Sequence, residues 1–319
     1  MKEMKEMAAD KRQNGEQNGK KPGGFPGKDA QAGRQEDIIR ATIRRMYRNN
    51  PLAVVSAAVI VLMILLAVFA PVIAPYKEAQ QDLLMRLHPP CAKHLLGTDE
   101  LGRDVFTRIL YGARVSLVIG IIPPLISLMI GIVLGLAAGY FGKWVDYLIM
   151  RLADIMLSIP SLLLSMAIMY TLGRYASSII SIFIALSLAG WASVARVVRS
   201  QTLSLKESEY VEAAHSIGVS SFRIMLRHIL PNCVPSLLVL YTLNVPSCIL
   251  SESTLSFLGV GVQPPAASWG LMVNQSKEFL FGMPWLALAP SIVIMIIVLA
   301  FNFLGDGLRD ALDPYLQKG

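Results

Sequence analysis

The sequence predicts an all-α membrane protein with six transmembrane helices. Of its 319 residues, 54% are hydrophobic and only 16% are charged, a balance that a soluble domain of this length cannot hide from water. The hydrophobic residues also gather in long uncharged runs rather than at amphipathic spacing, and a helix needs roughly 20 apolar residues to cross a hydrocarbon core. Composition and run length together place most of the chain in membrane lipid.

Five uncharged runs and one interrupted run are long enough to span the membrane. The first, 52–74, exceeds the apolar region of a signal peptide, so we expect it to remain as an anchor. The interrupted run, 147–172, carries Arg151 and Asp154 near its start. The expected spans are residues 52–74, 115–141, 147–172, 177–195, 233–251 and 279–305.

The lysine and arginine residues outside the spans predict the orientation. If the N-terminus is cytoplasmic, 20 of them fall on the cytoplasmic side and 8 on the other, which agrees with the preference of these residues for cytoplasmic loops. Six spans then return the C-terminus to the cytoplasm. The formal net charge of +7 therefore indicates membrane orientation and not nucleic-acid binding.

The spans divide the chain into five parts. Residues 1–50 form a basic cytoplasmic tail whose polar composition cannot bury a core, so we expect most of it to be disordered. The other parts are a first transmembrane helix at 51–75, an extracytoplasmic segment at 76–113, a five-helix core at 114–310 that includes a cytoplasmic loop at 205–232, and a cytoplasmic tail at 311–319.

Three glycines in the second span predict a close helix contact. Gly131, Gly135 and Gly139 recur every four residues, so they lie on one helix face and let a neighbouring helix of this subunit approach closely. Prolines inside the spans are expected to bend them, because each removes a backbone hydrogen bond. They are Pro123, Pro124, Pro160 and Pro246.

The cytoplasmic loop has the pattern of two short helices joined by a turn. The residues before Gly218 favour a helix, and Gly218 permits a sharp turn. The second helix is expected to end at Pro231 and to carry one apolar face at helical spacing: Phe222, Met225, Leu226 and Ile229. Periodicity alone fits an amphipathic connector lying against the membrane equally well.

The same loop resembles the EAA loop of binding-protein-dependent ABC importer permeases. His228 departs from that pattern, which has an aliphatic residue two positions before the final Leu-Pro. The residues that carry the resemblance are Glu212, Ala213, Ala214, Gly218, Leu230 and Pro231.

Three further stretches resemble the dipeptide, oligopeptide and nickel branch of these permeases. They are Leu96 to Asp104 with Tyr111 to Arg114, Leu255 to Pro265 with Ser268 to Gly270, and Gly305 to Pro314. Together with the loop, they cover nearly everything after residue 51. The glycine- and proline-rich backbone from Gly259 to Gly270 cannot continue a helix and is expected to form a loop or a re-entrant cap near the mouth of the pathway, the alternative being an ordinary surface loop.

The resemblance implies a type I ABC importer permease fold and a set of partners. These are a homologous second permease, two ABC ATPase subunits that hold ATP and Mg, and an extracytoplasmic solute-binding protein. The EAA loop would dock on an ATPase and couple its motion to the spans. Peptides are the expected cargo, and nickel or another small solute is the alternative. An ion-coupled secondary transporter or a channel is the alternative from a different class.

The sequence carries no enzyme signature of its own. A phosphate-binding loop needs Gly, four residues, Gly-Lys and then Ser or Thr. The pair Gly142-Lys143 could supply the Gly-Lys of this motif. However, Ala137 stands where the first glycine is required, and Trp144 stands where Ser or Thr is required. We therefore expect no cofactor in this chain and ATP hydrolysis by partner subunits.

Charged residues inside the spans are candidates for function, because charge in lipid is costly and normally faces protein or water. Arg151 and Asp154 are three residues apart and could pair with each other. A structural pair near the cytoplasmic surface is preferred to a cargo contact. Glu252 has no cation nearer in sequence than Lys277, so it is the better candidate for the pathway or an outer gate, unless its partner lies in the other permease.

One segment has the spacing of a transition-metal site. His88, Cys91 and His94 lie at three-residue intervals and offer ligands that suit nickel. Pro89 and Pro90 between them favour an extended backbone, in which side chains three apart point to opposite faces. We therefore predict no metal site here.

Overall fold

The computed structural model describes residues 50–173 and 176–312, and this part of the chain is helical with no strand. The expected disordered tail lies outside the described residues. The long helices are α3 (Pro51–Val68), α5 (Val105–Phe141), α6 (Lys143–Ser158), α7 (Ser161–Leu172), α8 (Ser178–Lys206), α11 (Leu230–Phe257) and α13 (Trp285–Leu312). The shorter ones are α4 (Ala70–Ile73), α9 (Glu209–Ser216), α10 (Ser221–Ile224), α12 (Trp269–Ser276), the 3-10 turns Leu83–Met85 and Lys277–Phe279, and a π-helical turn, Met225–Ile229.

The prediction of an all-α membrane fold is confirmed. In the described residues five helices are long and apolar enough to cross a membrane, and the pair α6 and α7 makes a sixth if it counts as one broken span. The expected single span 147–172 is in fact these two helices, which meet at 92°. Pro160 explains the break, because a proline cannot donate the next helical hydrogen bond and forces the residue before it into an extended conformation.

Several helices extend beyond the spans expected from hydropathy. Helix α5 begins at Val105 and not near 115, because the Asp104 side chain accepts a hydrogen bond from the Thr107 backbone N–H at 2.7 Å and caps the helix. At its other end α8 continues to Lys206. Hydropathy marks where a helix can lie in lipid, whereas capping decides where the helix ends.

The glycine face of α5 lies directly against α8. A Cβ atom added at Gly131 would lie 2.5 Å from Val194 Cγ1, and one at Gly135 would lie 2.6 Å from the Ala195 carbonyl oxygen. Gly139 approaches α8 equally closely at Thr202. The backbones of the two helices are therefore as close as side-chain-free positions allow.

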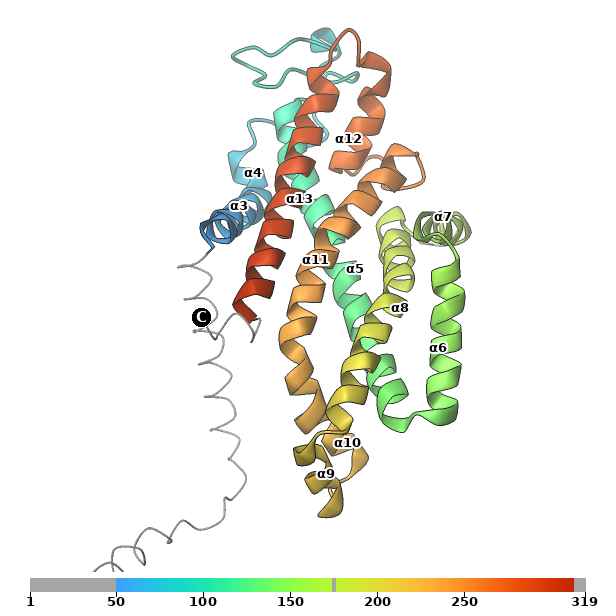
Figure 1. Cartoon of the computed structure of the whole chain (residues 1–319). Coiled ribbons are helices and arrows are strands. Elements are labelled where there is room, and N and C mark those ends of the chain that lie inside the picture. The colour runs from blue at the N-terminus through green and yellow to red at the C-terminus, as the bar shows by residue number, and fades with distance from the viewer. Residues whose placement is uncertain (1–49, 174–175, 313–319) are drawn as a thin grey trace, which may run out of the picture. The chain divides into compact units, whose positions relative to one another are not determined.

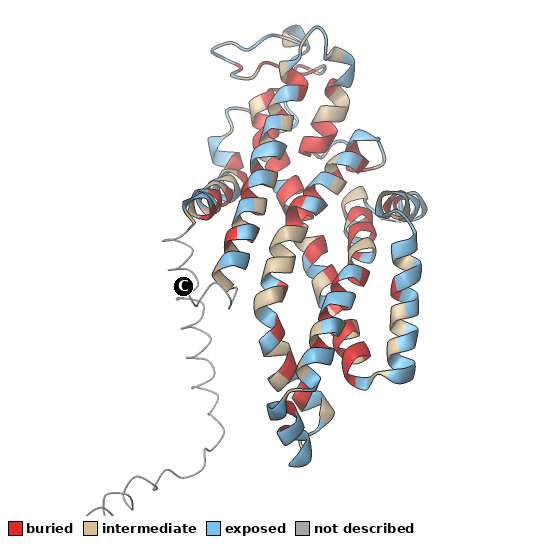
Figure 2. Ribbon diagram, viewed as in Figure 1, coloured by how far each residue is buried: buried red, intermediate tan, exposed pale blue. Residues whose placement is uncertain are grey.

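The other long helices pack around α5. Helices α11 and α13 pack against each other, and α3 packs against α13 (Figure 1). At one end, the Asn50 side chain donates a hydrogen bond to Asp310 at 3.0 Å and ties the start of α3 to the end of α13. The buried residues face these helix contacts, and the outward faces are exposed (Figure 2).

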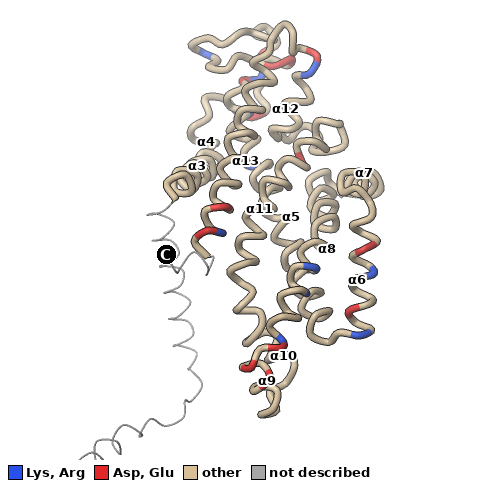
Figure 3. Tube along the Cα trace, viewed as in Figure 1, with Lys and Arg blue, Asp and Glu red and all other residues tan. Residues whose placement is uncertain are grey.

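The bundle has two distinct ends. Helices α9 and α10 form one end, here called the α9 end, and the loop before α5 lies with α12 at the opposite end, here called the α12 end (Figure 1). Charged residues lie mainly toward these ends, along α6 and α8 and at the end of α13 (Figure 3). This distribution is the one that membrane-crossing helices require.

Candidate functional site

The α9 end carries the loop that the sequence singled out. Helix α9 ends at Ser216, and Gly218 follows with a φ of +81°, a left-handed conformation that favours glycine. The chain then reverses into α10. The predicted sharp turn therefore lies at Gly218.

The second helix of the loop differs from its prediction in two ways. It does not end at Pro231, because Pro231 lies in the first turn of α11, where a missing N–H costs little. The residues of the expected apolar face are also not all buried within the chain: Met225 and Ile229 are buried, whereas Phe222 and Leu226 are exposed. Met225 begins a π-helical turn, in which the Leu230 N–H reaches back five residues to the Met225 carbonyl oxygen.

The loop leaves polar and apolar side chains exposed. Val211 and Ala214 of α9 are buried in a hydrophobic core that they share with residues of α5, α8 and α11. Glu212 and Ala213 are exposed. Two large apolar residues next to the turn, Ile217 and Phe222, are 63% and 69% exposed, and Figure 2 shows α9 and α10 mostly exposed. Exposed apolar side chains at a helix turn are typical of a surface that contacts a partner.

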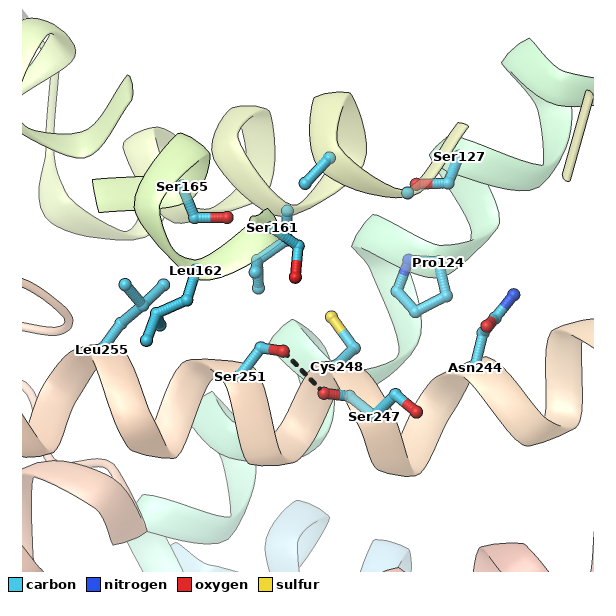
Figure 4. A pocket seen from close by; sticks show the side chains of 13 residues that line it. Pro124, Ser127, Ser161, Leu162, Ser165, Asn244, Ser247, Cys248, Ser251 and Leu255 are labelled. Atoms are coloured by element: carbon cyan, nitrogen blue, oxygen red, sulfur yellow. Dashed lines mark hydrogen bonds between the residues drawn. The ribbon is translucent and has the colours of Figure 1, made fainter. Parts of the chain in front are cut away.

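A cavity lined by both apolar and hydroxyl side chains lies among the spanning helices. Its volume is about 150 Å³, and α5, α7, α8 and α11 line it. The lining residues include no Asp, Glu, Lys, Arg or His. Figure 4 shows the polar residues that line it: Ser127, Ser161, Ser165, Asn244, Ser247 and Ser251.

The hydroxyl groups of this cavity are only partly used within their own helices. Ser251 donates to the Ser247 carbonyl at 2.8 Å, and Ser127 donates to the Ser187 carbonyl of α8 at 2.9 Å. A serine oxygen that donates its one proton keeps two lone pairs as acceptors. The cavity therefore offers neutral hydrogen-bonding groups to a solute without offering charge.

This cavity was missed in the sequence. The signal was present, because Ser161 and Ser165 lie four residues apart, as do Ser247 and Ser251. Serines at that spacing share one helix face. What the sequence could not supply was that α7 and α11 turn these faces toward each other.

The expected pair of Arg151 and Asp154 does not form. Asp154 instead pairs with Arg196 of α8, with an Arg196 Nη2 to Asp154 Oδ1 distance of 2.5 Å, and the Arg151 side chain is exposed. A second pair joins the same helices, with Arg199 Nη2 2.6 Å from Asp146 Oδ2. The carboxylates of α6 therefore pair with arginines of the neighbouring helix α8. Spacing along one helix cannot reveal such partners.

Glu252 is fully buried and is not among the residues that line the serine cavity. It accepts hydrogen bonds from serine hydroxyls, from Ser256 at 2.7 Å and from Ser253 at 3.5 Å. A buried ionic cluster at the α12 end was also missed. There Asp99 Oδ2 accepts from Arg103 Nε at 2.7 Å and from Arg108 Nη1 at 2.6 Å.

The residues with metal-site spacing have other partners. His94 Nδ1 lies 3.0 Å from Asp104 Oδ1, and its ring stacks on Tyr76. His88 Nδ1 lies 2.9 Å from the Pro89 carbonyl oxygen. Within residues 50–173 and 176–312, no three His, Cys, Asp or Glu residues are grouped so that they could hold a metal ion.

A bundle of helices that are long and apolar enough to cross a membrane defines a multi-pass membrane protein. The fold is similar to that of an inward-facing methionine ABC transporter, MetNI, with a TM-score of 0.52 and 17% identity over 65% of this chain and 96% of that chain. Residues 131–318 match the binding-protein-dependent transport system inner membrane components, and residues 40–90 match the N-terminal transmembrane domain of oligopeptide transport permease C. The chain belongs to the family of binding-protein-dependent transport system inner membrane components.

Curated relatives match along most of their length. The dipeptide transport system permease protein DppC of Alkalihalophilus pseudofirmus is 43% identical over 86% of this chain and 89% of its own. The oligopeptide transport system permease protein OppC of Bacillus subtilis is 43% identical over 85% of this chain and 88% of its own. The glutathione transport system permease protein GsiD of Escherichia coli is 43% identical over 86% of this chain and 89% of its own.

Proposed function

We propose that this chain is the transmembrane permease subunit of an ABC importer that moves peptides across the cytoplasmic membrane. The observation that carries this proposal is the uncharged, hydroxyl-lined cavity among the spanning helices. Peptides are rich in backbone amide groups, which hydroxyl and amide side chains can match by hydrogen bonding. Relatives named for dipeptides, oligopeptides and glutathione, which all contain peptide bonds, support the same cargo.

The proposed assembly contains a homologous second permease, two ABC ATPases and an extracytoplasmic solute-binding protein. ATP and Mg belong to the ATPases, and this chain performs no catalysis. Both termini and the α9 end lie in the cytoplasm, and the α12 end lies outside. The exposed Glu212, Ala213, Ile217 and Phe222 support a docking role for the α9 end.

The coupling path follows from the helix connections. Helix α10, the π-helical turn and α11 are continuous from Ser221 to Phe257, so a displacement of the loop is passed to a helix that lines the cavity. Closure of the ATPases on ATP would move the loop and open the cavity to alternate sides. A secondary transporter would instead need ion-coupling carboxylates in its cavity, and the lining residues of this cavity include none.

The cargo pathway is tested by placing a charge in the cavity. Ser247→Asp is expected to slow uptake of an acidic dipeptide at least about 30-fold relative to a lysine dipeptide, because two like charges about 8 Å apart repel by ~2 kcal/mol at an effective dielectric constant of about 20. The measurement is ATP-dependent uptake into proteoliposomes that contain the whole complex, with binding protein in excess.

Ser247→Asn is the matched control, since it adds similar volume without charge and should leave the ratio of the two uptake rates unchanged. Equal slowing of both dipeptides by Ser247→Asp would place the cavity outside the pathway. Uptake that does not depend on ATP would refute the importer assignment itself.

The absence of a metal role at the α12 end is tested by His88→Ala, Cys91→Ser and the double change. All three are expected to leave peptide uptake unchanged, because His88 and Cys91 belong to an exposed or half-exposed loop whose geometry does not bring three ligands together. The measurement is uptake of labelled dipeptide and of radioactive nickel by the same cells. Nickel uptake lost in either variant, with no peptide uptake in the parent, would overturn the peptide assignment.

A further inference from the structure

Glu252 is the centre of a buried hydrogen-bond network near the α12 end. Its side chain lies on α11 and is 0% exposed. Ser256 Oγ donates to Glu252 Oε1 at 2.7 Å, and Ser253 Oγ lies 3.5 Å from Oε2. The hydroxyls of Ser116 and Ser268 lie beside the same carboxyl group. The network thus joins α5, α11 and the residue that caps α12.

Three of these serines also hold the backbone that follows α11. Ser256 Oγ accepts from the Val262 N–H at 3.0 Å, Ser116 Oγ from the Trp269 N–H at 3.1 Å, and Ser268 Oγ from the Leu271 N–H at 3.2 Å. A serine has one proton and two lone pairs. When the proton points to the carboxyl group, the lone pairs are left to face the backbone donors. Glu252 therefore fixes the rotation of the Ser256 hydroxyl, and the hydroxyls of Ser116 and Ser268 lie beside the same carboxyl group.

The backbone held in this way is the segment 258–268, here called the α11–α12 loop. It packs closely on α11 at Gly261, where an added Cβ atom would lie 2.5 Å from Ser256 Cα. Its far side is attached less firmly, through the Gln263 N–H to Ser178 Oγ at 3.3 Å and the Ala267 N–H to Glu78 Oε1 at 3.3 Å. Part of the loop, from Val260 to Ala266, lines a second cavity of about 890 Å³, together with α7, α8 and Glu78.

We infer that Glu252 is a positioning residue that orients the serine hydroxyls around it, Ser256 first among them, holds the α11–α12 loop in place through them, and thereby sets the wall of the cavity at the α12 end. Glu252 acts through its neighbours, since it does not line either cavity. Its effect on cargo rests on the proposed function, in which this cavity opens toward the binding protein. Its effect on the position of the loop does not depend on the proposed function.

The loop position is measured with a cysteine pair. Ser178→Cys and Gln263→Cys are introduced in the complete complex, with Cys91, Cys233 and Cys248 replaced by alanine, and the rate of disulfide formation is followed by the loss of free thiols. Glu252→Ala is expected to lower this rate at least fivefold. Glu252→Gln is expected to restore it to within twofold, because the amide oxygen still accepts from a serine hydroxyl. Thr254→Ala is the matched control on the same helix, since its hydroxyl is exposed and bonds only to the Leu250 carbonyl.

An unchanged disulfide rate in Glu252→Ala would overturn the inference, as would a Glu252→Gln variant that behaves like Glu252→Ala. If Glu252→Ala does not assemble, Ser116→Ala removes one hydroxyl and should slow the disulfide at least twofold. An unchanged rate there would equally overturn it. Uptake measured on the same variants tests the proposed function separately. If a variant loses uptake while its disulfide rate stays normal, the position of the loop is not the cause of the loss.

Discussion

Gly135→Leu is expected to abolish assembly of a stable permease. The side chain would start at a Cβ position 2.6 Å from the Ala195 carbonyl oxygen and 2.6 Å from Val198 Cβ. A backbone oxygen on a packed helix cannot rotate away as a flexible side chain can, so α5 and α8 must separate. Overpacking of this kind costs about 3 kcal/mol, and here it also opens the longest helix contact in the bundle. The measurement is the yield of monodisperse protein after mild detergent extraction.

Val133→Leu on the same helix is the control. The Val133 side chain is exposed, so it gains volume without meeting α8 and should give the parental yield. Normal yield and thermal stability for Gly135→Leu would show that the close contact between α5 and α8 does not contribute to assembly.

Long apolar runs predicted the helical membrane fold because burial in lipid leaves a signal in composition alone. The limits of the helices were not predicted, since they depend on capping groups such as Asp104, which lies outside the apolar run. The break at Pro160 was expected as a bend, but its 92° angle reflects how α7 packs on α8. Local sequence sets where a helix can break, and tertiary packing sets the direction it then takes.

Contacts between helices explain what was missed at the candidate site. The spacing of Arg151 and Asp154 suggested a pair within one helix, but α8 places Arg196 next to Asp154 and the pair forms across helices. Glu252 was notable in the sequence for lacking a cation, yet a neutral hydroxyl serves it instead: Ser256 donates to it at 2.7 Å, and Ser116 of α5 and Ser268 before α12, both far away along the chain, lie beside it. A sequence shows which residues need partners, and the fold decides which partners they obtain.

Gly218→Val is expected to reduce transport at least tenfold while leaving membrane insertion intact. Gly218 has a φ of +81°, and an added Cβ atom would meet nothing within 4 Å, so the backbone conformation and not a steric contact is what requires glycine. A left-handed conformation costs an ordinary residue about 1–2 kcal/mol and a β-branched residue more. The turn would therefore relax and move α9 relative to α10. Gly218 itself is exposed and takes no part in the contacts between the long helices, so the bundle should still form.

Gly218→Asn separates this explanation from a general sensitivity of the loop, because asparagine tolerates the left-handed region and should retain most of the transport rate. The measurements are ATP-dependent peptide uptake and the stimulation of ATPase activity by loaded binding protein, both in proteoliposomes that contain the whole complex. Valine should lose both, whereas asparagine should keep both. A Gly218→Val complex that transports at the parental rate with normal ATPase stimulation would show that the geometry of this turn does not couple the ATPases to the membrane helices.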